Sequence, residues 1–135
     1  MTLIEESFAR LTGRPLLGPG ETLWDAPRAI VAHGTEADPI FFYGNRLALG
    51  LFELSAGDFA RLPSRLSAEP LLREERQTLL ERVSRDGFID DYAGIRISST
   101  GRRFRIEQAT VWNLVDAEGR LHGQAATFDR WTRLP

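Results

Sequence analysis

Three side chains on one predicted strand have the types and the spacing of a binding site. Gln108, Thr110 and Trp112 recur at every second position of the run Arg103–Val115, so a strand there would place all three on one face. Two neutral hydrogen-bonding groups beside an aromatic ring suit a small polar or heterocyclic ligand. In the alternative, Gln108 and Thr110 bond other side chains or water within a closed core, because buried polar groups require partners.

Two further residues, Tyr43 and Arg65, are predicted to take part in ligand binding. Tyr43 ends the β-like run Pro39–Tyr43, and Arg65 follows in a loop that contains proline. Together with Glu69 in the same loop, Arg65 could clamp an anion, although a solvated loop is the simpler interpretation. We therefore predict a ligand site and no catalytic residues.

The residues that could perform acid–base catalysis or bind a metal are poorly arranged for it. Asp90 and Asp91 are adjacent on a predicted strand, so their carboxylates point to opposite faces and do not share a proton. His33 and His122 are the only histidines, and they fall on different predicted strands. We expect both to be ordinary residues at strand ends, and we predict no metal site.

The composition removes several kinds of cofactor chemistry. The chain has no cysteine, so thiolate-bound metals, thiol nucleophiles and a cysteinyl bond to flavin are excluded. Haem is not expected, because the best predicted helix, Leu71–Asp86, contains no histidine. Every basic residue is arginine, so no lysine is available as a base or for a Schiff base. We predict no cofactor.

Length, composition and charge limit the kind of protein that this sequence can be. A chain of 135 residues with 42% apolar content indicates one domain, residues 1–135, that can bury a core. A net charge of −2 gives no general attraction to nucleic acid. No signal-like leader and no apolar run of membrane-spanning length is visible. We expect a soluble, cytoplasmic protein that binds neither nucleic acid nor membrane.

Hydrophobic periodicity and turn residues predict an α+β fold built on three consecutive strands. The order is a helix capped by Thr2 and ended by Gly13, a short helix Glu21–Ala26, strands Ala29–His33 and Pro39–Tyr43, helix Arg46–Glu53, a short helix after Ser55, helix Leu71–Asp86, and strands Phe88–Ser98, Arg103–Val115 and Leu121–Phe128. A five-stranded antiparallel sheet satisfies this order, with helices on one face and residues 1–28 as an N-terminal helical extension.

Alternation along two of these strands predicts which side chains face the core. In the strand Phe88–Ser98, an apolar set alternates with a polar set: Ile89, Ala93, Ile95 and Ile97 against Asp90, Tyr92 and Arg96. In the strand Arg103–Val115, one face collects Phe104, Ile106, Gln108, Thr110, Trp112 and Leu114. The inward face is therefore expected to be apolar at both ends and polar in its middle.

This element order is that of a PAS domain, and two stretches resemble PAS motifs. Ile40–Ser55 is similar to the PAS run of strand, Asn, small apolar helix, Leu-Phe and capping Ser, and Asp116–Gly123 resembles the late PAS hairpin. Nearly the whole chain more specifically resembles the MEKHLA domain. This PAS-related family occurs at the C-terminus of class III homeodomain-leucine zipper plant regulators and as stand-alone bacterial proteins. The resemblance is carried by Leu11–Leu17, Ala32–Phe41, Leu62–Pro70 and Gly94–Phe104, and most specifically by Arg103–Trp112.

The resemblance implies a PAS-like sensory or interaction module, of the stand-alone bacterial type, with no catalytic residues to transfer. The sequence shows no homeodomain, zipper or output domain, so we expect it to act through non-covalent partners, either a second copy in a homodimer or a regulatory protein. The expected mechanism is a population shift, in which a ligand between sheet and helices favours one packing of the two.

Two alternatives remain open from the sequence. One is a small cone-shaped α+β enzyme with an acid–base pocket, which would require His33 to converge with Asp91, or Tyr43 with Asp90. The other is a ligand-free interaction domain, which would have a tightly packed core and a large apolar surface patch.

Overall fold

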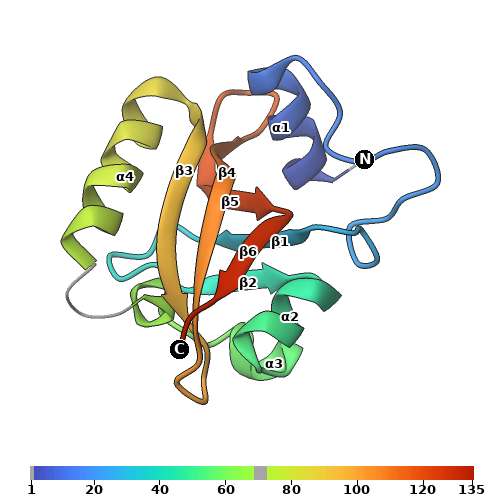
Figure 1. Ribbon diagram of the computed structural model, residues 1–135. Helices are drawn as coiled ribbons and strands as arrows, with labels where there is room; N and C mark the ends of the chain where they lie inside the picture. The colour runs from blue at the N-terminus through green and yellow to red at the C-terminus, as the bar shows by residue number, and fades with distance from the viewer. Residues whose placement is uncertain (1, 69–72) are drawn as a thin grey trace.

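Six strands form one antiparallel sheet, and helices lie against both of its faces (Figure 1). The computed structural model describes residues 2–68 and 73–135. In these residues the strands are β1 (Ala29–His33), β2 (Phe41–Gly44), β3 (Phe88–Ile97), β4 (Arg103–Val115), β5 (Leu121–Phe128) and β6 (Arg130–Arg133). The helices are α1 (Leu3–Thr12), α2 (Arg46–Phe52), α3 (Ala56–Phe59) and α4 (Arg73–Asp86), with a 3-10 turn η1 (Ser64–Ser67).

The strands are ordered β2-β1-β5-β4-β3, and β6 pairs with the first half of β4. The five predicted strands and the antiparallel sheet are confirmed. The sixth, β6, was not predicted, because its four residues are mostly exposed and show no apolar alternation. β4 pairs with β3 along one edge and with β5 and β6 along the other, so it is the central support of the later half of the sheet.

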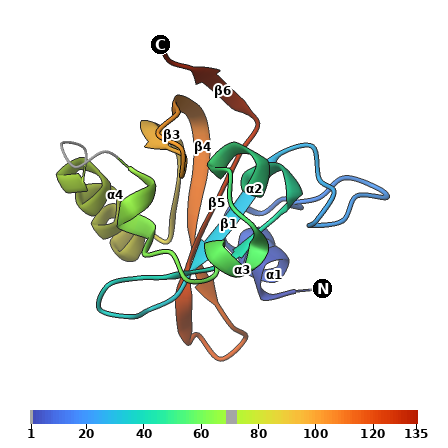
Figure 2. The same ribbon diagram turned by 90° about the horizontal axis from the view of Figure 1, so that it is seen from below.

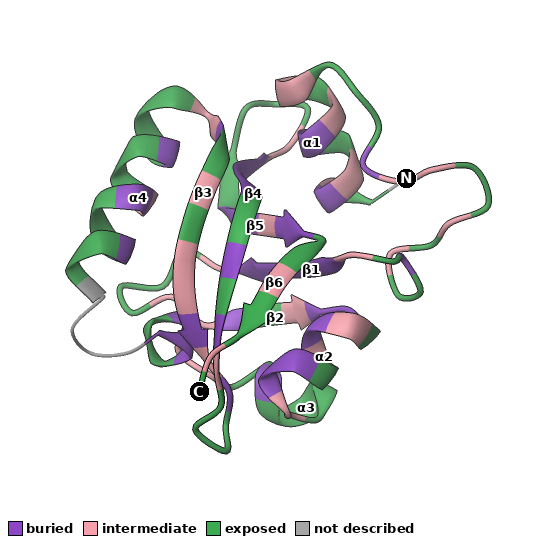
Figure 3. Ribbon diagram, viewed as in Figure 1, coloured by how far each residue is buried: buried purple, intermediate pink, exposed green. Residues whose placement is uncertain are grey.

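The two faces of the sheet are covered by different helices (Figures 1 and 2). On the inner face, α2 and α3 bury Phe52 and Phe59 against the sheet, and α4 buries Val83 there. On the opposite, outer face, Phe8 of α1 meets Trp112 of β4 edge to face, with ring centroids 4.9 Å apart. Figure 3 shows the buried positions of α4 turned toward the sheet. The prediction of helices on one face thus holds for α2, α3 and α4, and the N-terminal helix covers the other face.

Hydrogen bonds to the end of β4 fix α1 in its own chain. Ser7 is fully buried, and its Oγ donates to the Val115 carbonyl at 2.8 Å while accepting from the Val115 backbone N–H at 2.9 Å. Arg10 Nη1 donates to the same carbonyl at 2.7 Å. These bonds connect the end of β4 to α1.

The predicted caps define the ends of the first three helices. Thr2 and Glu5 form a capping box at the start of α1, and Gly13 ends that helix with a φ of 76°. Asn45 caps α2 and Ser55 caps α3, each by accepting a backbone N–H with its side chain.

One predicted helix can be compared with the structure only at its end, and another is not formed. The predicted start of the long helix, Leu71, lies outside the described residues, and its predicted last residue, Asp86, is confirmed as the end of α4. The segment Glu21–Ala26, predicted as a short helix, instead forms a turn at residues 23–25. It lies before Pro27 and is too short to hold a helix without tertiary support.

β4 changes its pattern of facing at Gln108. This residue has a φ of 51°, in the left-handed region, and the pairing of β4 with β3 shifts between Tyr92 and Gly94. The extra residue in β4 is a β-bulge, which interrupts the strict alternation of a strand. Beyond the bulge, residues of even number therefore leave the inner face and residues of odd number replace them.

The bulge corrects the predicted facing of β4. Before and after it, the inner core receives Phe104, Ile106, Ala109 and Val111. Trp112 and Leu114 belong to the outer core beneath α1. The prediction that every second residue from Phe104 to Leu114 lies on one face is therefore wrong. It assumed a regular strand, and the inserted residue of the bulge reverses the alternation.

Candidate functional site

A cavity of about 60 Å³ lies between α4 and the inner face of the sheet, partly open to solvent. Most of its wall is apolar and comes from β1, β4, β5 and the neighbouring helices. Its polar lining consists of His33, Ser67, Arg76, Tyr92, Arg96 and Gln124. Concave, mainly apolar sites with a few convergent polar groups are the usual form of a small-molecule site.

Side-chain amides hold α4 over this cavity. Asn113 Nδ2 on β4 donates to the Val83 carbonyl at 3.0 Å, and Gln124 Nε2 on β5 contacts the Leu80 carbonyl at 3.3 Å. Both amides are buried beneath the helix. Because helix carbonyls in mid-helix are already bonded within the helix, these second bonds orient α4 without disrupting it.

Two guanidinium groups border the cavity from opposite sides. Arg76 extends from α4 and is 8% exposed, and Arg96 extends from β3 and is 9% exposed. Arg76 Nη2 donates to the Ser64 hydroxyl, while Arg96 Nη2 donates to the Tyr92 hydroxyl at 2.6 Å. Burial lowers the pKa of Arg76 to about 10, and the nearby positive charge of Arg96 adds to that effect. With a pKa of about 10, Arg76 is still charged at neutral pH.

His33 supplies a further buried polar group at the end of β1. Its Nδ1 lies 3.0 Å from the Gly34 carbonyl, which can only accept, so Nδ1 carries the proton and Nε2 is the unprotonated nitrogen. Nε2 is buried and has no hydrogen-bond partner among the described residues. Burial is the main cause that lowers the pKa of His33, and the charge of Arg76 also lowers it. The imidazole is therefore neutral at physiological pH.

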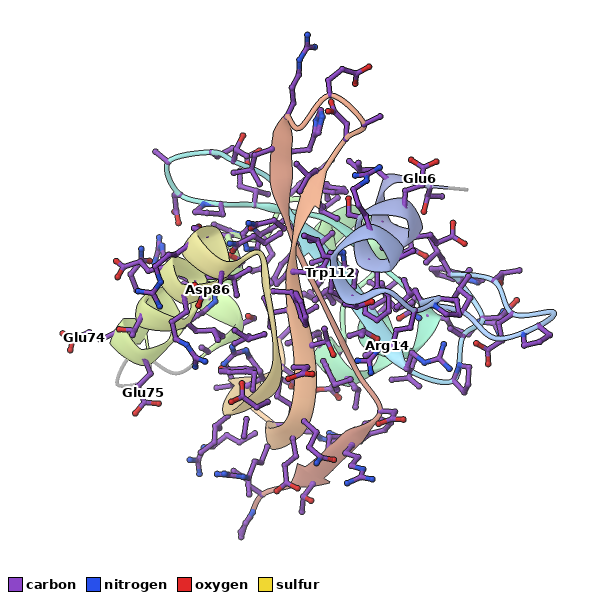
Figure 4. The ribbon with its side chains drawn as sticks, turned by 90° about the horizontal axis from the view of Figure 1, so that it is seen from above. Glu6, Arg14, Glu74, Glu75, Asp86 and Trp112 are labelled. Atoms are coloured by element: carbon purple, nitrogen blue, oxygen red, sulfur yellow. The ribbon has the colours of Figure 1, made fainter. Side chains whose placement is uncertain are left out.

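The three predicted ligand contacts on β4 lie away from this cavity. Gln108 is exposed and accepts from Arg130, while Thr110 is buried; both border an open hollow on the outer face. Trp112 is fully buried beneath α1, on the side of β4 away from α4 (Figure 4). Its Nε1 has no hydrogen-bond partner among the described residues. Their predicted role in ligand binding stays a prediction.

The other two predicted contacts are also apart from the cavity. Tyr43 is half-buried in the outer core, and burial raises the pKa of its hydroxyl. Arg65 is exposed and ion-paired with Asp38, with Nε 3.1 Å from Oδ1. Glu69, its predicted partner in an anion clamp, lies outside the described residues.

The structure does not assemble either of the acid–base pairs required by the enzyme alternative. His33 on β1 and Asp91 on β3 are separated by β5 and β4 in the sheet. Asp91 is exposed instead beside Arg82, with 4.0 Å between Nη2 and Oδ1. Tyr43 and Asp90 lie on β2 and β3, the two outermost strands.

Sequence reasoning missed Arg76, Arg96 and Gln124, and a signal existed for the first. Arg76 precedes Leu79, Leu80 and Val83 at the spacing of one helical face, so it is the charged member of an apolar stripe. Arg96 was placed with the polar set of β3, and register shifts on both sides of Tyr92 bring it to the cavity instead. No local pattern marks Gln124.

The chain matches a known protein family over almost its whole length. The model of the MEKHLA domain matches residues 1–133. The chain belongs to the MEKHLA domain family. Among curated proteins, the homeobox-leucine zipper protein ATHB-9 of Arabidopsis thaliana is 29% identical over 141 residues, covering 96% of this chain and 17% of that protein. Homeobox-leucine zipper protein HOX9 of Oryza sativa subsp. indica is 24% identical, over 82% of this chain and 13% of that protein. The MEKHLA chain thus spans less than a fifth of these relatives.

Solved structures confirm the α+β PAS-like fold of this MEKHLA domain. A PAS domain from Colwellia psychrerythraea has a TM-score of 0.68 at 14% identity, covering 83% of this chain and 90% of that one. The light-state dimer of the fungal blue-light photoreceptor Vivid has a TM-score of 0.65 at 14% identity, covering 92% and 91%. At these identities the likeness concerns the fold.

The described residues have neither a metal-binding cluster nor a membrane-spanning helix. They contain no cluster of three or more histidine, aspartate or glutamate side chains suited to a metal ion. They also contain no helix with the length and apolar character needed to cross a membrane.

Proposed function

We propose that this MEKHLA domain is a non-catalytic sensory or regulatory module that binds a small molecule in the cavity between α4 and the inner face of the sheet. The observation that carries the proposal is the combination of an apolar wall with buried, convergent polar groups on both sides of it. A purely structural core would fill this space with apolar side chains, because an unfilled cavity and buried polar groups both lower stability.

Flavin, whose analogue was studied in a light-oxygen-voltage domain that has a TM-score of 0.59 to this chain, does not suit this cavity. A cavity of about 150 Å³ binds benzene, and this one is about 60 Å³. A flavin has three fused rings, so it would require α4 to move away from the sheet. The chain also has no cysteine with which to form a flavin adduct. A smaller ligand is favoured.

The proposed signal passes through β4. Ile106 and Val111 of this strand line the cavity, while Trp112 of the same strand supports α1 on the outer face. A ligand that favours one position of α4 would shift the packing of β4, and α1 would present that change to a second copy or to a regulatory protein. The similarity to homeobox-leucine zipper proteins supports a regulatory partner, and the similarity to the light-state dimer of Vivid supports a second copy.

Native mass spectrometry of the purified protein, repeated after denaturation, tests the proposal. An excess mass that disappears on denaturation is the expected result. In Ala126→Ile, which extends a side chain into the cavity from β5, we expect that mass to be lost. Leu121→Ile, at an exposed position of the same strand, should retain it. An excess mass that survives Ala126→Ile would place the ligand elsewhere and contradict the proposal.

A further inference from the structure

We propose that the ligand of the cavity beneath α4 is a small organic carboxylate, held at its charged end by Arg76 and Arg96 and along its remaining atoms by the apolar wall. This inference rests on the proposed function, since it names the chemistry of the molecule that the same cavity would take.

The positive charges of Arg76 and Arg96 are not compensated by a carboxylate of the described residues. Arg76 and Arg96 are 8% and 9% exposed, and neither forms an ion pair with a carboxylate of the described residues. Asp38 is the acid that acts on Arg76 at longer range, and its carboxylate is bonded to Arg65. A buried charge without a counter-ion is destabilising, so two of them at one cavity indicate that a partner of opposite sign belongs there.

Both arginines have more hydrogen-bond donors than the described residues use. Each guanidinium has five N–H donors arranged in a planar fork. Among the bonds of the described residues, Arg76 uses Nη2 toward Ser64, and Arg96 uses Nη1 toward the Ile95 carbonyl and Nη2 toward Tyr92. The remaining donors match the paired oxygens of a carboxylate, which guanidinium groups bind in a bidentate manner.

The two positive charges reach the cavity from different elements. Arg76 comes from α4 and Arg96 from β3, so the helix and the sheet each contribute one positive group to the space between them. Each charge disfavours the other, since the charge of Arg96 acts on the pKa of Arg76. An anion placed between them would convert this repulsion into attraction and would draw α4 toward β3.

Size and lining separate an organic acid from an inorganic anion. The cavity is about 60 Å³, enough for a few non-hydrogen atoms. Phe41, Ile106 and Val111 offer no hydrogen bonds to it. Phosphate would leave oxygens facing these side chains, whereas a short carbon chain would bury apolar surface against them.

Titrations with matched acids and amides test the inference. The isotopically labelled protein would be followed by NMR at fixed ionic strength, through backbone amides and arginine Nε–H signals, during addition of acetate or butyrate. Acetamide and butyramide are the neutral controls of the same shape, and inorganic phosphate is the separate anion. We expect at least one acid to bind roughly tenfold or more tightly than its amide, since hydrogen bonds to charged groups are the stronger ones.

Substitutions assign the effect to the two arginines. Arg76→Gln keeps a hydrogen-bond donor for Ser64 without the charge, and Arg96→Gln tests the opposite wall independently. Both should lose the preference for the acid, and Arg76→Lys should recover part of it. Arg82→Gln, on the exposed side of the same helix, should bind the acid as the original protein does.

The results that would contradict the inference differ from those that would also contradict the proposed function. Equal binding of acids and amides, or acid binding unchanged in Arg76→Gln and Arg96→Gln, would overturn the inference and leave a ligand-binding module. A neutral molecule identified as the retained mass would do the same. Phosphate binding tighter than every acid would replace the organic carboxylate by an inorganic anion. No response to any compound, together with no retained mass, would overturn both the inference and the proposed function.

Discussion

Gln124 and Asn113 occupy paired positions on β5 and β4, and Gln124 Nε2 donates to Asn113 Oδ1 at 3.1 Å beneath α4. Each amide also bonds a main-chain carbonyl of that helix. The pair therefore connects the helix that covers the cavity to the strands that form its floor. Because buried amides must all be satisfied, loss of one member leaves the other incompletely bonded.

Gln124→Leu should loosen α4 specifically. We expect a loss of about 1–3 kcal/mol in the free energy of unfolding, from the unpaired polar groups left behind. Hydrogen exchange of the second half of α4 should become faster, while that of α1 stays the same. The control is Thr127→Val, at another position of β5. It removes a buried hydroxyl that is bonded to the carbonyl of Ala29 on β1. If both variants changed α4 exchange equally, the amide pair would not be its anchor.

Trp112→Phe should cost little stability. The indole Nε1 is buried without a partner among the described residues, so its removal eliminates an unsatisfied donor and offsets part of the lost contact area. Trp112→Ala should lose about 3–5 kcal/mol, because it empties the space against Phe8. Chemical denaturation measures both. Ligand retention should be unchanged in Trp112→Phe, and its loss would show that this side chain contacts the ligand after all.

Asn45→Ala should be among the most destabilising single changes. The fully buried amide accepts from the backbone N–H groups of Ile30 and Ala48 and donates to the carbonyls of Leu23 and Arg28. We expect a loss of about 3 kcal/mol or more, since a cap and several buried bonds disappear together.

The matched control for that change is Ser55→Ala, which removes the same kind of cap from the exposed end of α3. It should cost about 1 kcal/mol. Equal losses in the two variants, measured by denaturant unfolding, would mean that Asn45 acts only as a helix cap and not as a connection between segments.

Gly123→Ala should disrupt the junction of β5 and β1. Gly123 has a φ of 143°, and a Cβ there would lie 1.9 Å from the backbone carbonyl oxygen of His33. We expect a loss of about 3 kcal/mol or more, because backbone atoms must separate. Gly119→Ala is the control, since it has a φ of 82° but open space around its Cβ. Thermal unfolding should show a much larger decrease for Gly123→Ala, and similar decreases would refute the clash.

The stability of the protein should decrease as the pH falls below 6.5. Burial lowers the pKa of His33 from 6.5, with Arg76 adding to the effect and Glu36 opposing it, so the unfolded chain takes up the proton more readily. The contribution is complete above pH 6.5 and is lost as the pH falls from 6.5 toward the folded pKa. His33→Gln should flatten the dependence of the unfolding free energy on pH in this window.

His122→Gln is the comparison for the histidine titration. The pKa of the Asp116 carboxyl is lowered from 3.8 to about 2, mainly by its hydrogen bond to His122 and further by the backbone N–H groups of Arg120 and Glu118. The Asp116 contribution is therefore complete above pH 3.8 and is lost as the pH falls toward 2. His122→Gln should alter the lower window. If it also removed the dependence near pH 6, the assignment to His33 would be incorrect.

The order of elements was readable from the sequence, because caps, glycines and apolar periods are local signals. Thr2, Asn45 and Ser55 begin the helices that they were predicted to begin. The facing of residues on β4 was not readable, since the bulge at Gln108 is set by pairing with β3 and not by composition. For the same reason, the sequence did not indicate that Gln108, Thr110 and Trp112 lie away from the cavity between α4 and the sheet, and their role in ligand binding stays a prediction.

The bulge at Gln108 also affects how related chains should be aligned. Because β4 has one extra residue here, a relative that lacks this residue would have a regular strand, and the residues after the gap would keep the faces that they have in this chain. A relative of the same length without the bulge would instead turn the position of Trp112 toward α4 and that of Val111 toward α1. A one-residue gap near Gln108 in an alignment therefore indicates loss of the bulge with the cavity wall retained, whereas an ungapped alignment assumes that the relative has the bulge.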